Sequence, residues 1–308
     1  MCWNKLLCNH QELHLLGTLS GGQSFRWTHN KESDEWTGVF SKTVWKLRQR
    51  DNFIQYQVLG TFSSKSDKFF QTLLSNYFRL DMNLVEYYKR WSEKDELFKK
   101  ACQQFYGIRM LNQEPEYFCG CHVGFKIFQI ESQLRKLGLG YRSKFIQKSA
   151  SQIVDWGGTE WFCSLQKMKY KDARQELMKL YGIGPKVADC ICLMSLGHLS
   201  ALPVDTHVYQ IAANNYLPHL RGKKTVTDKM YAEIGDHFRD LYGDMAGWAH
   251  TVSTLLFFVD KFVTLSLATI KKKVLISCFR NDLRFLLVSS HSYFHESRPS
   301  AIFMNYVG

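Results

Sequence analysis

The first hundred residues alternate between hydrophobic and polar positions and then change to a helical period. The segments Glu35–Phe40, Thr43–Gln49 and Phe53–Leu59 are rich in β-branched and aromatic residues, and polar turns separate them. This partial alternation predicts an antiparallel sheet with one covered face. From Asp67 onward the apolar positions fall at helical spacing, and Asp81 is a candidate cap for the helical segment that follows it.

From Leu134 to Val252 the pattern is mainly helical and glycine clusters interrupt it. The sequence therefore predicts an α+β protein, in which an antiparallel sheet domain with helices precedes an all-helical domain. We place the sheet domain at residues 1–115 and the helical domain at residues 116–252. Residues 253–308 contain hydrophobic clusters without clear caps or a sustained period, and we expect them to form a divergent tail.

Composition and charge narrow the class of protein. Of 308 residues, 45% are hydrophobic and 15% aromatic, which excludes a disordered chain. No uncharged apolar run reaches the length of a membrane span, and the N-terminal residues lack the apolar region of a secretory signal, so we expect no membrane association. The 40 Lys and Arg exceed the 28 Asp and Glu, a net charge of +12. This excess favours a nucleic-acid partner, although a basic but unspecialised protein is the alternative.

The nine cysteines indicate reduced thiols in an intracellular protein. Cys119, Cys121 and His122 lie close together, but no second Cys/His pair stands at zinc-finger spacing. We therefore expect these three residues to have a packing role, and we expect no metal site among them.

The segment Leu180–Cys192, LYGIGPKVADCIC, has the form of a helix–hairpin–helix. Gly182 and Gly184 flank Ile183 and permit a tight turn that lets the backbone approach a DNA phosphate. Backbone N–H groups at the start of the second helix can bind that phosphate without reading sequence. The alternative is an ordinary glycine turn between two helices.

Lys186 and Asp205 are the candidate catalytic residues. Lys186 falls in the first turn of the second helix, where the positive end of the helix dipole disfavours a charged ammonium and so favours a nucleophilic amine. Asp205 in LPVDTH supplies a carboxylate at the entry of the next helix. A lysine and a carboxylate suit displacement at a sugar C1′ with an oxocarbenium-like transition state. A phosphate-binding role for Lys186 and an N-cap role for Asp205 remain open on spacing alone.

The sequence resembles the helix–hairpin–helix Gly/Pro/Asp superfamily of DNA glycosylases, and more narrowly the eukaryotic 8-oxoguanine DNA glycosylases/AP lyases. The resemblance extends from about Leu7 to Val252. It rests on GIGPKVADCICLM with PVDTHV and on three further segments: SGGQSFRW (Ser20–Trp27), LRKLGLGYR (Leu134–Arg142) and AGWAH (Ala246–His250). An iron–sulfur relative is disfavoured because a four-cysteine C-terminal cluster is absent from the sequence.

The resemblance implies excision of 8-oxoguanine from duplex DNA, with Lys186 as the Schiff-base nucleophile and Asp205 stabilising developing positive charge. The abasic site is then cleaved by β-elimination. Gly22 matches the glycine whose carbonyl accepts the N7 hydrogen of the lesion. Three further residues are expected at the flipped base: Cys190, Pro203 and His250, the last standing where the family usually has a glutamine.

The resemblance also implies which residues contact DNA, where a monovalent cation binds and in which cellular compartment the protein acts. We expect these residues on DNA: Tyr141, Arg142, Gly182, Gly184, Val187, His207 and Lys224. The carbonyls of Met178, Leu180 and Ile183 are expected around a monovalent cation, and no cofactor or catalytic metal is needed. The expected partner is double-stranded DNA with oxidised guanine or abasic sites, bound by a monomer in the nucleus, with the mitochondrion as an alternative.

The sequence departs from the family in two places. Glu116–Gln133 replaces a much longer helical stretch that carries an asparagine-rich turn and an arginine in the family, and the segment after Val252 replaces one carrying a base-stacking phenylalanine. These abrupt breaks indicate a variant or mis-spliced form with an internal deletion and a divergent C-terminus. The alternatives to an active enzyme of this type are a catalytically silent DNA-binding remnant and a glycosylase for another damaged base.

Overall fold

An antiparallel sheet forms the N-terminal part of the protein. The computed structural model describes residues 3–61, 65–115, 130–136, 138–223 and 225–255. Five strands pair in the order β1-β5-β4-β3-β2, and every neighbouring pair is antiparallel. Their bounds are β1 Asn4–Leu7, β2 Trp27–Asn30, β3 Glu35–Phe40, β4 Thr43–Arg50 and β5 Phe53–Thr61.

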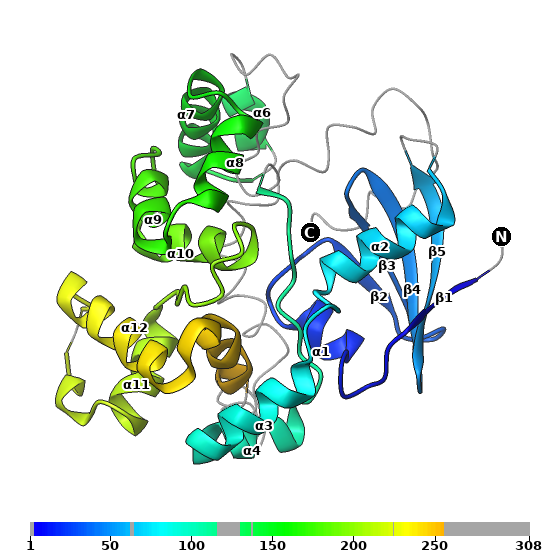
Figure 1. The fold of residues 1–308 in the computed structure, drawn as a ribbon. Coiled ribbons are helices and arrows are strands. Elements are labelled where there is room, and N and C mark those ends of the chain that lie inside the picture. Colours follow the sequence, from blue (N-terminus) through cyan, green and yellow to red (C-terminus); the bar gives the residue numbers. More distant parts are fainter. Residues whose placement is uncertain (1–2, 62–64, 116–129, 137, 224, 256–308) are drawn as a thin grey trace.

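One face of this sheet packs against helix α2 (Asp67–Tyr77), whose N-cap is Ser66 (Figure 1). Alternate residues of the strands, among them Trp45 and Tyr56, are almost fully buried against the apolar side of this helix. The indole N–H of Trp27 donates to the hydroxyl of Tyr77 at 3.0 Å. The alternation of hydrophobic and polar residues in the sequence therefore corresponds to a sheet with one covered face.

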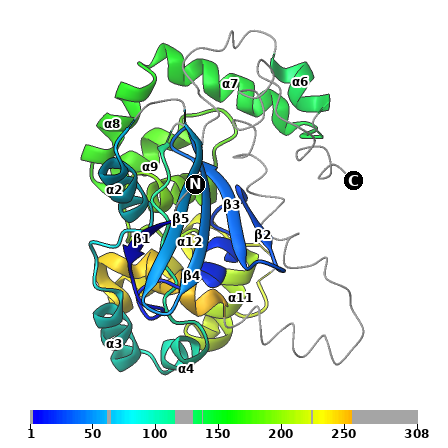
Figure 2. The ribbon, with the colours of Figure 1, turned by 90° about the vertical axis from the view of Figure 1, so that its right-hand side faces the viewer.

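Helices form the rest of the described structure (Figure 1). Residues 246–255 are also helical, after two short 3₁₀ turns at Pro218–Leu220 and Gly243–Met245. The labelled helices are α1 Leu15–Ser20, α3 Leu84–Lys94, α4 Glu96–Gln104, α6 Ile130–Lys136, α7 Arg142–Asp155, α8 Thr159–Lys167, α9 Tyr170–Met178, α10 Pro185–Met194, α11 Thr206–Asn215 and α12 Asp228–Tyr242. Figure 2 shows α7 and α8 above the sheet and α3 and α4 below it.

The described residues form two hydrophobic cores, and residues that are neighbours in the sequence do not always belong to the same core. The sheet, α1 and α2 share one core, whereas α3 and α4 belong to the core of the helices that follow α6. Buried Asp95 at the N-cap of α4 accepts hydrogen bonds from the hydroxyls of Tyr216 (2.7 Å) and Tyr242. The indole of Trp248 donates to the carbonyl of Ile108 at 2.8 Å. Helices from both ends of the described chain therefore complete one core.

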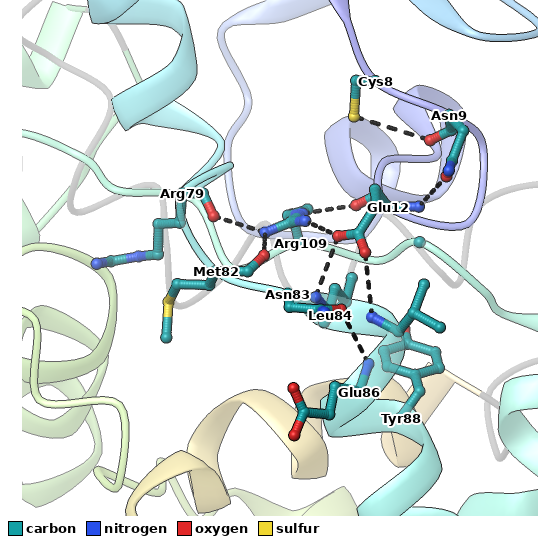
Figure 3. Close-up of polar contacts among 12 residues, drawn as sticks. Cys8, Asn9, Glu12, Arg79, Met82, Asn83, Leu84, Glu86, Tyr88 and Arg109 are labelled. Carbon is teal, nitrogen blue, oxygen red and sulfur yellow. Dashed lines mark hydrogen bonds and ion pairs between the residues drawn. The ribbon is translucent and has the colours of Figure 1, made fainter.

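A buried arginine joins the sheet domain to α3 (Figure 3). Arg109 is 1% exposed, and its guanidinium donates to the backbone carbonyls of Glu12, Arg79 and Met82. The same group forms an ion pair with the Glu12 carboxylate, which also accepts the backbone N–H of Leu84 (3.1 Å) at the start of α3. Because a buried charge needs such partners, Arg109 fixes these three segments relative to one another.

The predicted α+β class is confirmed, and β3, β4 and β5 fall on the three predicted strands. The predicted cap Asp81 is wrong: Asn83 caps α3 by accepting the N–H of Glu86 at 3.1 Å. Strands β1 and β2 and helix α1 were not predicted. No helix in the described residues is long and apolar enough to span a membrane.

Some predictions concern residues outside the described part of the chain. These are Lys224, residues 116–129 with Cys119, Cys121 and His122, and the tail beyond residue 255. The domain boundaries at residues 115 and 252 also stay predictions. Within the described residues Cys8, Cys102, Cys163, Cys190 and Cys192 do not form disulfides.

Candidate active site

The predicted helix–hairpin–helix is formed by α9, a short turn and α10. Gly182 has φ +83°, and a Cβ there would lie 2.8 Å from the ring of Phe145, so glycine is required. Gly184 is the N-cap of α10 with φ −95°, and a Cβ there would meet no atom within 4 Å. Pro185 at the first helical position loses no hydrogen bond by lacking an N–H. No side chain caps the start of α10, and the backbone at Gly184 therefore lies beside open space.

Helix α7 holds this hairpin in place. The Ser149 hydroxyl donates to the carbonyl of Tyr181 at 2.6 Å, and the Gln152 carboxamide oxygen accepts the N–H of Tyr181 at 2.8 Å. The Gln152 amide also donates to the carbonyl of Lys179 at 3.3 Å. These bonds satisfy backbone groups that a glycine turn leaves without helical partners.

Lys186 and Asp205 meet as the sequence predicts. The Lys186 Nζ lies 3.5 Å from Oδ2 of Asp205, and both side chains are partly exposed. Oδ1 of Asp205 caps α11 by accepting the N–H groups of His207 (2.9 Å) and Val208 (2.8 Å). The N-cap role and the proposed catalytic role are therefore compatible, because each uses a different carboxylate oxygen.

His250 lies close to this pair in the helical core. Its side chain is 4% exposed, packs edge-on against Phe238 with 4.9 Å between ring centroids, and contacts the Thr254 hydroxyl. Burial lowers the pKa of His250 to about 4, while the Asp205 carboxylate acts in the opposite direction. The imidazole is therefore neutral at physiological pH and adds no positive charge beside Lys186.

Cys190 and Pro203, the other residues predicted at the base, occupy the elements that carry Lys186 and Asp205. Cys190 is half-buried on α10, one turn after Lys186, and Pro203 is half-buried in the segment that leads to Asp205. Val187 and His207, predicted on DNA, lie half-buried in the first turns of α10 and α11.

Tyr141 and Arg142 lie at the start of α7 and join the hairpin through a residue that the sequence analysis missed. Tyr141 is 65% exposed, and its ring centroid lies 5.7 Å from that of Phe145. Phe145 in turn contacts the ring of exposed Tyr181 on the hairpin at 5.3 Å. The spacing of Phe145 four residues after Tyr141 on one helix was the available signal.

Gly22 lies in the loop between α1 and β2, in the sheet domain, and has φ +79°. The next residue, Gln23, is buried and exchanges hydrogen bonds with residues 109–113: its side chain donates to the carbonyl of Arg109 (2.7 Å) and its carbonyl accepts from Gln113 (2.6 Å). The N–H of Gln113 donates to the carbonyl of Met194 at the end of α10 (2.8 Å). The segment 109–113 therefore couples the Gly22 loop to the helix that carries Lys186.

The carbonyls of Met178, Leu180 and Ile183 lie at the end of α9 and in the hairpin. Oxygen donors of this kind suit a hard cation. The Leu180 carbonyl accepts the N–H of Ile183 at 3.2 Å, which leaves it one further lone pair. The donor set fits a monovalent cation, which stays a prediction. No group of three or more His, Cys, Asp or Glu side chains placed to hold a metal occurs in the described residues.

Comparisons with known proteins identify the family to which the chain belongs. Residues 5–116 match the model of the 8-oxoguanine DNA glycosylase N-terminal domain. The N-glycosylase/DNA lyase OGG1 of Arabidopsis thaliana is 34% identical over 292 residues, spanning 81% of this chain and 79% of the relative. The N-glycosylase/DNA lyase of Saccharomyces cerevisiae is 30% identical over 322 residues, spanning 81% and 85%.

Among solved structures, the 8-oxoguanine glycosylase/lyase of Clostridium acetobutylicum, in complex with dsDNA containing cytosine opposite 8-oxoG, is similar in fold. It has a TM-score of 0.66 at 22% identity and covers 81% of this chain and 93% of its own. On this shared fold, the α9–α10 hairpin carries a lysine–carboxylate pair, Lys186 and Asp205. The identity to the plant and yeast proteins is more specific, and the chain belongs to the N-glycosylase/DNA lyase family.

The alignment with the Arabidopsis thaliana relative contains positions that this chain does not fill. It extends over 292 positions, whereas the 81% of the 308 residues that it spans amounts to about 249 residues. About 43 positions therefore have no residue of this chain opposite them.

Proposed function

We propose that this protein is a bifunctional DNA glycosylase/AP lyase that excises 8-oxoguanine from duplex DNA and cleaves the resulting abasic site. The observation that carries the proposal is the Lys186–Asp205 pair, 3.5 Å apart at the head of the hairpin's second helix. Membership of the N-glycosylase/DNA lyase family and the net charge of +12 support it. The site contains both a nucleophile and a carboxylate, the two groups that displacement of the base uses.

Lys186 and Asp205 divide the chemistry between them. The neutral amine of Lys186 attacks C1′ of the damaged nucleotide, the C1′–N bond breaks, and the base leaves with the bonding electrons. Oδ2 of Asp205, which does not cap α11, stabilises the positive charge that develops on the sugar. The sugar ring then opens: the C1′–O4′ bond breaks, O4′ takes up a proton, and the nitrogen loses its proton, which gives an imine. Transfer of a C2′ proton to a base such as the departed nucleobase or water then expels the 3′ phosphate by β-elimination.

The target base must leave the helical stack before Lys186 can reach C1′. We propose that Tyr141, Arg142 and the uncapped start of α10 hold the opened duplex, and that the base enters beside Cys190, Pro203 and His250. The Gly22 carbonyl would then accept the N7 hydrogen, which guanine lacks. An unmodified guanine would leave this acceptor unpaired, and this cost provides the discrimination.

Borohydride trapping tests the proposal. Wild-type protein incubated with an 8-oxoguanine·cytosine duplex and sodium borohydride should form a covalent protein–DNA adduct, and an undamaged duplex should not. Lys186→Gln should abolish the adduct and retain DNA binding. Lys179→Gln is the matched control, because Lys179 is an exposed lysine of the same hairpin that pairs with Glu176 at 2.6 Å. Undiminished trapping by the Lys186 variant would refute the assignment.

A further inference from the structure

A buried carboxylate lies on α10 between the positions of Lys186 and Cys190 in the sequence. Asp189 is completely buried, three residues after Lys186, and accepts three side-chain hydrogen bonds. Oδ1 accepts from the Tyr170 hydroxyl (2.7 Å) and the Arg174 Nε (2.9 Å), both on α9, and Oδ2 accepts from the Tyr231 hydroxyl on α12. Burial raises the pKa of Asp189, and these three donors act in the opposite direction by stabilising the carboxylate.

Besides Asp189, the Tyr231 hydroxyl contacts the carbonyl of Leu202 (3.4 Å) and the N–H of Val204, and within the described residues the Tyr170 hydroxyl has neither partner. While it donates to Asp189, it accepts the backbone N–H of Val204 at 3.1 Å. Val204 directly precedes Asp205, so one oxygen atom connects α10 with the segment that positions the catalytic carboxylate. Tyr170 approaches Asp189 from α9, and its hydrogen bond does not involve that segment.

A polar bridge connects the two elements that carry Lys186 and Asp205. Lys186 belongs to α10, whereas Asp205 begins α11 after the loop at residues 195–205. The bridge Asp189–Tyr231–Val204 spans these two elements within one helical turn of both catalytic residues. A rotation of α10 or a displacement of the loop would break one of its two hydrogen bonds.

We propose that Tyr231 is a positioning residue for the lysine–carboxylate pair. It acts through Asp189 and Val204 and does not contact DNA or the reacting atoms. The proposal rests on the proposed function, since it assigns a role in the same reaction. A displacement of about 1 Å between reacting groups can reduce a rate by about two orders of magnitude, so loss of this hydroxyl should affect chemistry more than binding.

Single-turnover cleavage of a duplex with a pre-formed abasic site is the appropriate assay, because it needs Lys186 but no base extrusion. Tyr231→Phe should lower the rate constant at saturating protein by about 10- to 100-fold and leave the half-saturating concentration within about threefold of wild type. Tyr170→Phe removes a hydrogen bond to the same carboxylate and should leave the rate constant within about threefold. Melting temperatures of all proteins are measured so that rates are compared between folded chains.

The outcomes separate the two proposals. If wild-type protein neither cleaves the abasic duplex nor forms the borohydride adduct, the proposed function fails. If wild type is active and the two tyrosine variants have equal rate constants, the positioning role is refuted and the proposed function stands. If Tyr231→Phe melts below the assay temperature, Asp189→Asn is the second variant. It retains the hydroxyl and weakens its acceptor, and a wild-type rate constant in that variant would also refute the role.

Discussion

Replacement of His250 by glutamine should make the protein more resistant to acid. The imidazole is buried against Phe238, and burial lowers its pKa from 6.5 to about 4. In the unfolded chain the pKa returns to about 6.5, so the unfolded state binds more protons below that pH. The contribution of His250 is therefore fully present above pH 6.5 and is lost as the pH falls toward 4.

The size of the effect follows from this difference. Proton linkage with these two pKa values removes about 2 kcal/mol between pH 7.5 and pH 5, and about 3 kcal/mol by pH 4. Glutamine does not titrate, so the difference between wild-type and His250→Gln unfolding free energies should change by this amount over that range. Other titrating groups are common to both proteins and cancel in the difference, apart from Asp205, whose carboxylate interacts with His250.

Urea denaturation at pH 7.5, 6.5, 5.5 and 5 would measure these free energies. A constant offset between the two proteins reports the change in packing, and only the pH-dependent part reports the imidazole. His219→Gln is the control, because His219 lies on the surface beside Glu233. A pH-independent difference between His250→Gln and wild type would show that His250 is not buried in the neutral form and would refute the reasoning.

Three further predictions concern the hairpin, the buried arginine and the order of activities. Gly182→Ala should lower stability by about 1–3 kcal/mol because of its positive φ and the contact with Phe145, whereas Gly184→Ala should keep the wild-type melting temperature and weaken DNA binding in a salt titration. Arg109→Met should cost about 3–5 kcal/mol in urea unfolding, and the exposed Arg90→Met less than about 1 kcal/mol. Pre-formed abasic sites should be cleaved faster than 8-oxoguanine is excised, since base extrusion costs a few kcal/mol; equal single-turnover rates would contradict this.

Local patterns in the sequence predicted much of the fold. Strands β3 to β5 follow from alternation, because each exposes one face and buries the other. Strand β1 was missed because four residues carry too little pattern and its partner β5 lies about fifty residues away. The cap of α3 was misplaced by two residues, since Asp81 and Asn83 are both suitable caps and only the backbone conformation decides between them.

In the site, too, residues in contiguous motifs could be predicted and contacts between distant parts of the sequence could not. The glycine hairpin, Lys186 and Asp205 were found because their motifs are contiguous. The Tyr231 bridge could not be found, since Tyr231 lies 42 residues after Asp189 on another helix and has the pattern of an ordinary amphipathic position. The resemblance to known glycosylases supplied roles for Gly22 and His250 that no pattern around either residue indicates.

The assignment of α3 and α4 to the helical core has a consequence for synthesis of the chain on the ribosome. These two helices emerge early, but they bury their apolar sides against residues 216–252, which emerge more than a hundred residues later. Contacts between residues so far apart in the sequence form slowly. Until they form, the apolar sides of α3 and α4 are exposed to solvent and promote aggregation. The N-terminal 115 residues therefore include two helices that pack in a core completed only by later residues. A nascent chain or a truncated fragment that stops before Trp248 leaves α3 and α4 without their partners and is a client for chaperones.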